Sequence, residues 1–313
     1  MTGPAEPPAG AGWLLEVDPA SAGLRLDLFL SLRIHRLSRA RAARLRVVDL
    51  DEPDRSLRKS QTVRAGQRLW VERPLPDGDA ETSAPVVLHA DADLLVLAKP
   101  PDLAVHPTAS RFVRTVTHWL ATTTPEGTPR PEPAHRLDVE TSGVLVCGRH
   151  ALAIRALKQL FADQHVQKRY LAVVEGRPAW DETLVDQPLG PATDSAVRIK
   201  MGPGDLPAVT ALKVVARGGR RSMVEARPVS GRQHQIRVHL ALLGHPIVGD
   251  KLYGPDEGLF LAHLDRPLDD AELGRLGHPR HALHAAEVAL PWRGEVRRFQ
   301  AAWPAELDAL WQD

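Results

Sequence analysis

The stretch HRLDVETSGVLV, residues 135–146, is a dense group of polar residues that runs directly into an apolar strand. Asp138 lies in the turn before that strand, where a rigid element holds a carboxylate in a defined direction, and it is therefore a candidate catalytic residue. The structural alternative is an Asx-turn, in which Asp138 accepts hydrogen bonds from nearby backbone amides. Glu140 is a weaker candidate, because nothing in the neighbouring sequence holds its side chain.

A second polar stretch, GRQHQIRVH at residues 231–239, is expected to begin a helix. Ile236 and Leu240 fall on one apolar stripe, and His234 and Arg237, three residues apart, share a neighbouring face. An arginine that emerges from a packed helix suits a fixed ion pair. The alternative is an ordinary solvated surface residue.

The stretch KRYLAVVEG, residues 168–176, is predicted to be a strand preceded by cations. The chain has two tyrosines, Tyr170 and Tyr253, and both lie in polar stretches rather than in plain core strands. This placement makes Tyr170 a candidate site residue. A buried tyrosine with one bonded hydroxyl is the alternative.

Hydrophobic periodicity predicts more strands than helices, without regular alternation of the two. The sequence therefore favours an α+β fold with a mixed or antiparallel sheet over a doubly wound fold. Residues 86–88 and 94–97 are expected to form a hairpin. Helices are expected at about 113–122, 150–163 and 233–243, and strands at 143–148, 169–176, 208–216, 222–229 and 283–290.

A length of 313 residues suggests two domains. We expect a flexible tail at 1–15, a small domain at 16–73, a linker at 74–85 and a large domain at 86–313. Within the small domain, amphipathic patterns predict two helices, at about 24–32 and 38–45, followed by strands between 60 and 71. The linker, PLPDGDAETSAP, is polar and rich in turn-forming residues.

Composition excludes several classes of protein. The single cysteine, Cys147, allows neither an intramolecular disulfide nor a cysteine-based zinc site, which fits a reducing, cytoplasmic compartment. No stretch approaches 18 uncharged apolar residues, so no membrane span is expected. His278, His281 and His284 are interrupted by Pro279, and no phosphate-binding glycine loop occurs, so we expect neither a metal nor a cofactor.

Taken together and in this order, these stretches resemble the RluA-type pseudouridine synthases, which isomerise uridine to pseudouridine in ribosomal or transfer RNA. Residues 135–143 match the family motif H-R-L-D-x-x-T-S-G at every fixed position. Further segments resemble the other family motifs: KPPDLAVHP at 99–107, in which Asp102 replaces the commoner glycine, KRYLAVVEG at 168–176, GRQHQIRVHLALLGHPIVGDKLYG at 231–254, and LHA at 283–285.

Residues 24–73 resemble an S4 domain, a small RNA-binding module, although RVVDLDEP at 46–53 departs from the usual Asn-Gly turn. The total formal charge of +1 hides an asymmetry. Residues 24–73 carry thirteen Lys and Arg against six Asp and Glu, a charge of +7, and the rest of the chain carries −6. The resemblance implies RNA contacts from Arg39, Arg41 and Arg44.

The resemblance also implies roles for the candidate residues. Asp138 is the nucleophile, which attacks C1′ of the ribose or C6 of the base, and Arg237 is the cation that keeps it ionised. Tyr170 packs against the target base, with a secondary role in removing the C5 proton. Arg136 is a wedge or phosphate clamp for the flipped nucleotide, with a structural salt bridge as the alternative.

We expect a monomeric enzyme whose partner is RNA. The S4-like module favours large-subunit ribosomal RNA over transfer RNA. The rival reading is a ribosome-assembly factor that binds RNA without turnover. A hydrolase using Asp138 and Glu140 as paired carboxylates has no support from water-binding or sugar-binding surroundings.

Overall fold

The computed structural model describes residues 12–34, 42, 45–53, 55–72, 83–107 and 114–312. The chain divides into two compact units, one of residues 1–81 with 107–114 and one of residues 82–106 with 115–313. Most of the predicted linker, together with Arg39, Arg41 and Arg44, lies outside the described residues. The same applies to most of the helix predicted at about 38–45.

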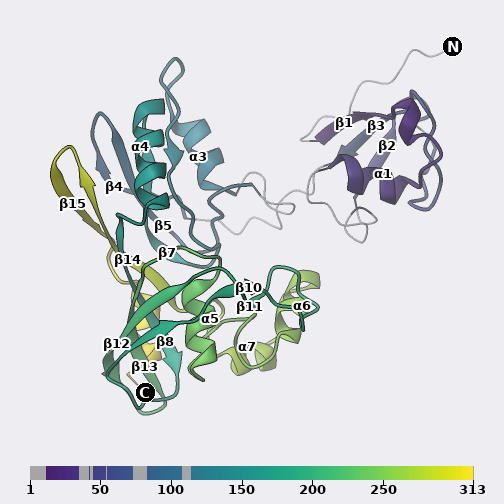
Figure 1. The fold of residues 1–313 in the computed structure, drawn as a ribbon. Coiled ribbons are helices and arrows are strands. Elements are labelled where there is room, and N and C mark those ends of the chain that lie inside the picture. Colours follow the sequence, from purple (N-terminus) through teal and green to yellow (C-terminus); the bar gives the residue numbers. More distant parts are fainter. Residues whose placement is uncertain are drawn as a thin grey trace. The chain divides into compact units, whose positions relative to one another are not determined.

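The smaller unit is a three-stranded antiparallel sheet with a helix packed on it (Figure 1). Helix α1 buries Leu26, Phe29 and Leu30 in one core with Leu69 and Val71 of the sheet, as its amphipathic pattern predicts. The strands have the order β1-β3-β2. The elements are β1 (Gly12–Glu16), the 3₁₀ turn η1 (Pro19–Ser21), α1 (Leu26–Arg33), β2 (Val47–Asp49) and β3 (Arg68–Glu72).

Two expectations for this unit are corrected. The tail predicted at 1–15 is too long, because β1 starts at Gly12 and pairs with β3. Trp13 and Leu15 alternate along β1 and pack against the core, a period-two signal that the glycine- and proline-rich start of the chain obscures. Of the strands predicted between 60 and 71, the structure has β3, while Thr62 contributes an isolated bridge to Arg25.

The larger unit is built on one ten-stranded mixed sheet (Figure 1). Its main path runs β4-β5-β7-β14-β8-β13-β12-β9, with β15 beside β14 and β6 beside β7. The β7–β14 pair is parallel, and the other pairs are antiparallel. This arrangement confirms the predicted α+β class with a mixed sheet.

The strands of that sheet include those predicted from the sequence. The hairpin at 86–97 and the five later strands are confirmed within a few residues at each end, whereas β6, β9 and β15 had no predicted counterpart. The bounds are β4 (Val86–Ala90), β5 (Leu94–Lys99), β6 (Glu132–Pro133), β7 (Ser142–Gly148), β8 (Gln167–Glu175), β9 (Glu182–Asp186), β12 (Val209–Arg217), β13 (Arg221–Pro228), β14 (Leu283–Trp292) and β15 (Glu295–Gln300).

Helices cover parts of this sheet. The three helices predicted in this unit are confirmed as α3, α4 and α5. Helix α4 packs on β7, and α5 contacts β12 and β13 through the buried Ile236 and Leu240. No helix in the described part of the chain is long and apolar enough to cross a membrane. The helices are α3 (Val116–Thr123), α4 (Ala151–Ala162), α5 (Gln235–Leu242), α6 (Gly258–Asp265), α7 (Asp270–Leu276) and the 3₁₀ helix η2 (Ala305–Leu310).

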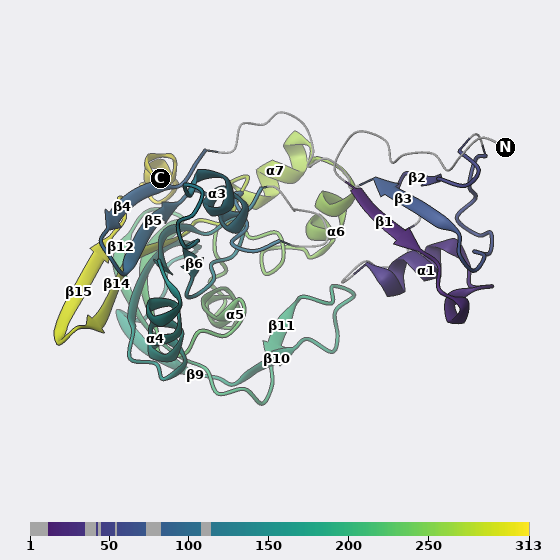
Figure 2. The same cartoon turned by 90° about the horizontal axis from the view of Figure 1, so that it is seen from above.

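Helices α6 and α7 had no predicted counterpart. A signal for α7 is present in the sequence, because Asp269 and Glu272 stand at the spacing of a capping box, and each side chain accepts a hydrogen bond from the other residue's backbone amide. A short hairpin of β10 (Leu189–Pro191) and β11 (Met201–Pro203) lies outside the ten-stranded sheet (Figure 2). The backbone amide of Met201 in this hairpin donates a hydrogen bond to the hydroxyl of Tyr253.

Candidate active site

The turn that carries Asp138 is held from two directions. On one side, Gly143 has a φ of 117° and lies so close to the backbone of Ala285 in β14 that a Cβ atom would clash with it. On the other side, the buried ammonium of Lys99 donates to the carbonyl of Val139 at 3.0 Å and to two carbonyls of its own loop. The turn therefore occupies a defined position before β7.

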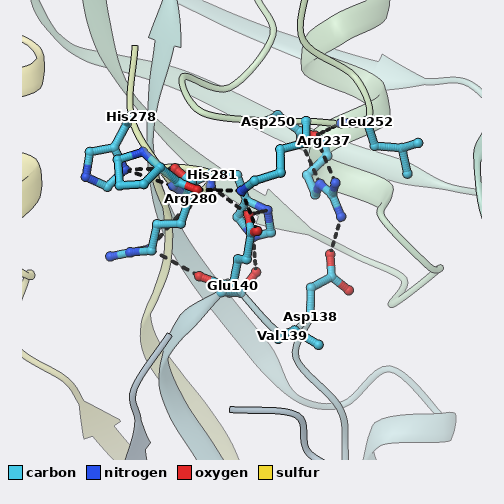
Figure 3. Close-up of polar contacts among 12 residues, drawn as sticks. Asp138, Val139, Glu140, Arg237, Asp250, Leu252, His278, Arg280 and His281 are labelled. Atoms are coloured by element: carbon cyan, nitrogen blue, oxygen red, sulfur yellow. Dashed lines mark hydrogen bonds and ion pairs between the residues drawn. The ribbon is translucent and has the colours of Figure 1, made fainter. Parts of the chain in front are cut away.

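Arg237 links this turn to a distant part of the chain (Figure 3). Its Nη1 donates to Oδ2 of Asp138 at 2.9 Å. Its Nε donates to Oδ2 of Asp250 at 2.6 Å, and its Nη2 donates to Oδ1 of the same residue at 2.8 Å. The structure thus brings Asp138 and Arg237 together, and it adds Asp250, a third charged residue that no sequence pattern marked as a site residue.

Asp250 is the anchor of this arrangement. Its side chain is fully buried, and its Oδ1 also accepts hydrogen bonds from the backbone amides of Leu252 and Tyr253 at 2.9 and 3.0 Å. A buried carboxylate needs such compensation. In the sequence, Asp250 ends the polar segment GHPIVGD, but no local pattern indicates that Arg237 is its partner.

The electrostatics keep Asp138 ionised. Burial alone would raise the pKa of Asp138, but His234, Arg237 and the hydrogen bond from Arg237 outweigh it and place the pKa well below the usual carboxyl range. Burial lowers the pKa of His234 to about 4, so this ring is neutral near pH 7. The guanidinium of Arg237 therefore provides the positive charge. The two carboxylates in turn raise the pKa of Arg237 against the effect of its burial.

Tyr170 borders the same site from strand β8. The half-buried ring packs among the apolar residues of two core clusters, and its neighbours across the sheet are Ala226 and Ala285. Burial, and then the negative charge of Asp138, raise the pKa of Tyr170, so its hydroxyl is protonated at neutral pH. That hydroxyl makes no hydrogen bond to any residue in the described part of the chain.

His234 and Tyr253 complete the surroundings of the carboxylate. Nε2 of His234 lies 4.0 Å from Oδ2 of Asp138, and its Nδ1 lies 2.8 Å from the hydroxyl of Tyr253. The guanidinium of Arg237 stacks over the Tyr253 ring at 5.0 Å from its centroid. Both residues belong to the segment 231–254, where the sequence placed His234 on a face beside Arg237.

Glu140 is not the unsupported side chain that the sequence suggested. Its Oε1 accepts a hydrogen bond from Nζ of Lys251 at 2.6 Å. Its Oε2 accepts one from the backbone amide of His281 at 3.0 Å (Figure 3). Burial alone would raise the pKa of Glu140, but His281 and Lys251 lower it. This carboxylate is therefore part of the scaffold beneath the turn rather than a second reactive group.

Of the four predicted RNA-binding residues, the structure describes only Arg136. Arg136, next to the turn, is exposed and forms no ion pair with any residue that the structure describes, so the salt-bridge alternative has no partner there. Arg39, Arg41 and Arg44 lie outside the described residues.

The histidine-rich segment 278–284 is structural. His281 contacts the Thr141 hydroxyl at 2.8 Å, His284 contacts the Ser142 hydroxyl at 2.9 Å, and His278 contacts the carbonyl of Arg280. Within the described ranges, no group of three His, Cys, Asp or Glu side chains is arranged to hold a metal ion.

This arrangement suits nucleophilic chemistry. It holds one ionised carboxylate in a partly enclosed position, a cation that prevents its protonation, a protonated tyrosine and a neutral histidine. A carboxylate with a depressed pKa is a poor general acid, but it is available to form a covalent bond with an electrophilic carbon.

Comparisons with known proteins point to one family. A family model described as RNA pseudouridylate synthase matches residues 93–242, which include Asp138, Tyr170 and Arg237. An uncharacterized RNA pseudouridine synthase of Chloroflexus aurantiacus is 36% identical over 304 residues, covering 94% of this chain and 91% of that protein. The ribosomal large subunit pseudouridine synthase D of Zymomonas mobilis is 32% identical and covers 93% of each chain.

A solved structure gives the same result. Human RNA pseudouridylate synthase domain containing 1 aligns with a TM-score of 0.59 and 26% identity, covering 74% of this chain and 91% of that one.

Proposed function

Since the chain belongs to the RluA-type RNA pseudouridine synthases, and is therefore an isomerase, we propose that Asp138 is the nucleophile of its reaction. The observation that carries this proposal is the ion pair between Asp138 and Arg237, at 2.9 Å, in a partly enclosed site. Because its pKa lies well below the usual carboxyl range, Asp138 is ionised at neutral pH. Its Oδ1, which does not receive the hydrogen bond from Arg237, is left for attack.

The reaction breaks the C1′–N1 bond of uridine, turns the base and forms a C1′–C5 bond, with loss of the C5 hydrogen as a proton and gain of a proton at N1. Asp138 forms a temporary bond to C1′ or to C6 and is released at the end, so no redox partner is consumed. Tyr170 is close enough to Asp138 for the carboxylate to raise its pKa, and this supports stacking of the uracil on its ring. Its hydroxyl has no hydrogen-bond partner among the described residues, which supports a secondary role at the C5 proton.

The target nucleotide must leave its stack to reach Asp138, at a cost of a few kcal/mol. We assign Arg136 to this step, because it stands two residues from the nucleophile and its exposed guanidinium forms no ion pair with any residue that the structure describes. It would fill the vacated space or bind a phosphate. The basic S4-like module of residues 16–73 binds further phosphates of the RNA backbone, and it includes Arg39, Arg41 and Arg44.

The proposed substrate is large-subunit ribosomal RNA. Relatives named ribosomal large subunit pseudouridine synthase D support it, and they align over more than nine-tenths of this chain. Transfer RNA is the second candidate. Mapping of pseudouridines in total RNA from cells with and without the gene separates the two, because the missing site lies in one RNA or the other.

Release of tritium from RNA labelled at C5 of uridine tests the assignment of the nucleophile. The wild-type protein should release tritium, and Asp138→Ala and Asp138→Asn should release none while they still bind RNA. Asp138→Asn is the matched variant, since it keeps the size of the side chain and removes its charge. Undiminished release by Asp138→Asn would overturn the assignment. Binding without release by the wild-type protein would favour the assembly-factor alternative.

A further inference from the structure

A line of polar contacts leads from hairpin β10–β11 to the nucleophile. The backbone amide of Met201 in β11 donates to the hydroxyl of Tyr253 at 2.8 Å. The same hydroxyl lies 2.8 Å from Nδ1 of His234. Nε2 of His234, on the far side of the ring, lies 4.0 Å from Oδ2 of Asp138.

The protons in this line have one consistent arrangement. The Met201 amide is only a donor, so the Tyr253 oxygen accepts there. The Tyr253 hydroxyl keeps its proton, because burial raises its pKa, and Nδ1 of His234 is the acceptor within reach. With the ring neutral near pH 7, Nδ1 is then unprotonated and Nε2 carries the hydrogen.

The opposite tautomer is disfavoured. If Nδ1 carried the hydrogen, the Tyr253 oxygen would accept two hydrogen bonds, and its own proton would have no partner among the described residues. Tyr253 is buried, and an unsatisfied buried donor costs about 1–3 kcal/mol. The hydroxyl of Tyr253 therefore sets the tautomer of His234.

The Nε2–H of His234 is left without an acceptor among the described residues. At 4.0 Å the Asp138 carboxylate is beyond hydrogen-bond range, and its Oδ2 already accepts from Arg237. His234 also has a φ of 55° as the residue before helix α5, a left-handed conformation that is unfavourable for a residue with a Cβ. Such strain is typical of functional positions.

We propose that His234 is a further catalytic residue, whose Nε2–H donates a hydrogen bond to a carbonyl oxygen of the target uracil, and that Tyr253 is the positioning residue that sets its tautomer. This proposal rests on the proposed function. In both routes for Asp138, electrons move into the uracil ring: cleavage of the C1′–N1 bond leaves a uracil anion, and addition at C6 leaves an enolate. Each places negative charge on O4, where a fixed neutral donor stabilises it.

The tautomer is tested without any activity measurement. Nitrogen-15 NMR of the full chain with labelled histidine should show His234 with a protonated Nε2 and an unprotonated, hydrogen-bonded Nδ1, assigned by its absence in His234→Gln. Tyr253→Phe should shift that signal toward a mixture of tautomers. A protonated Nδ1 in the wild-type protein would overturn the proposal.

A matched pair of variants tests the catalytic role. Glutamine places an amide N–H near the position of Nε2, whereas asparagine places one near Nδ1. We expect His234→Gln to keep kcat for tritium release within about 10-fold and His234→Asn to lose about 100-fold or more, with little change in KM. Tyr253→Phe should lower kcat by an intermediate factor.

The outcomes separate this proposal from the one it rests on. Equal kcat values for His234→Gln and His234→Asn, with wild-type turnover present, would overturn the role of His234 and leave Asp138 as the nucleophile. Absence of tritium release by the wild-type protein would instead remove the proposed function, and the role of His234 with it. Circular dichroism melts confirm that the compared variants are folded.

Discussion

Asp250 accepts two parallel hydrogen bonds from Arg237, at 2.6 and 2.8 Å, and so leaves one guanidinium nitrogen to face Asp138. Asp250 is fully buried, whereas the Asp138 side chain is 19% exposed. The two carboxylates therefore divide two roles between them. Asp250 holds the guanidinium in place, and the positive charge of the guanidinium keeps Asp138 ionised.

This division predicts unequal effects on stability. Asp250→Ala should destabilise the protein by about 3 kcal/mol or more, because it removes one partner of a buried ion pair and two acceptors of backbone amides. Asp138→Ala should cost less than about 1 kcal/mol, since Arg237 keeps Asp250. Urea unfolding of both variants measures the difference. Equal losses would show that Asp138 is a structural partner of Arg237.

The pair of Glu140 and Lys251 should be energetically coupled. Both side chains are largely buried, and their charged atoms lie 2.6 Å apart. Glu140→Gln and Lys251→Met should each destabilise the protein, and the double variant should lose less than the sum by about 1–3 kcal/mol. Each single variant should also lower kcat by displacing the turn of Asp138. A coupling energy near zero in urea unfolding would mean that the pair does not hold the turn.

Tyr170 should contribute to RNA affinity through its ring. Tyr170→Phe should leave the Kd for RNA within about 3-fold, while Tyr170→Leu should weaken it by about 1–3 kcal/mol through lost stacking. Filter binding measures both variants. A fall in tritium release with unchanged affinity in Tyr170→Phe would assign the hydroxyl to removal of the C5 proton. Equal affinity of the Phe and Leu variants would exclude stacking.

Buried histidines should make the protein sensitive to mild acid. Burial lowers the pKa of His284 to about 4, below the value of about 6.5 for an unfolded chain. As pH falls from 6.5 to 4, the unfolded state binds a proton that the folded state does not, so stability falls by up to about 1.4 kcal/mol per pH unit. Above pH 6.5 the His284 ring is neutral in both the folded and the unfolded state, so it causes no change of stability with pH there.

The variant His284→Gln should reduce this pH dependence, since glutamine does not titrate. Urea midpoints between pH 7 and 5 measure the slope. Asp138 and Asp250 do not contribute to the slope in that window. Their pKa values are lowered in the folded protein, so their stabilising effect is lost only as pH falls below the usual carboxyl value of about 3.9. An unchanged slope in His284→Gln would show that this ring titrates normally in the folded protein.

The basic module should determine the salt dependence of RNA binding. Replacing Arg39, Arg41 and Arg44 by Gln should weaken binding and reduce the slope of log K against log salt by up to about 2–3. Replacing the same three residues by Lys keeps their charges and should keep the slope. If the Gln variant binds RNA with the wild-type slope, the phosphate contacts lie in the catalytic domain.

Local sequence pattern was sufficient for much of the fold. Runs of apolar residues predicted β7, β8, β12, β13 and β14, and period-3.6 runs predicted α4 and α5. The helices and β12 bury one face in their unit, whereas β7 is buried at every position and β14 at its first eight positions. Strand β1 was missed because its alternating Trp13 and Leu15 follow a segment without apolar residues to pack.

The sequence by itself determined which residues are candidates for the reaction. The motif HRLDVETSG and its two companion segments identified Asp138, Tyr170 and Arg237 before any geometry, because motif order and spacing are properties of the chain. The closeness of Asp138 to Arg237 was an inference from family resemblance, and the fold brings them together across 99 residues.

Only the tertiary structure decided how those residues are held. Asp250 as the anchor of Arg237, Lys251 and the His281 amide as partners of Glu140, and Tyr253 as the partner of His234 join segments up to 141 residues apart. Local periodicity reports which face of an element is apolar, but it carries no information about which distant carboxylate or cation meets that face. For Glu140 and His281, that choice arises when β7 pairs with β14, because this pairing brings the turn of Asp138 and Glu140 against the strand that begins at Leu283.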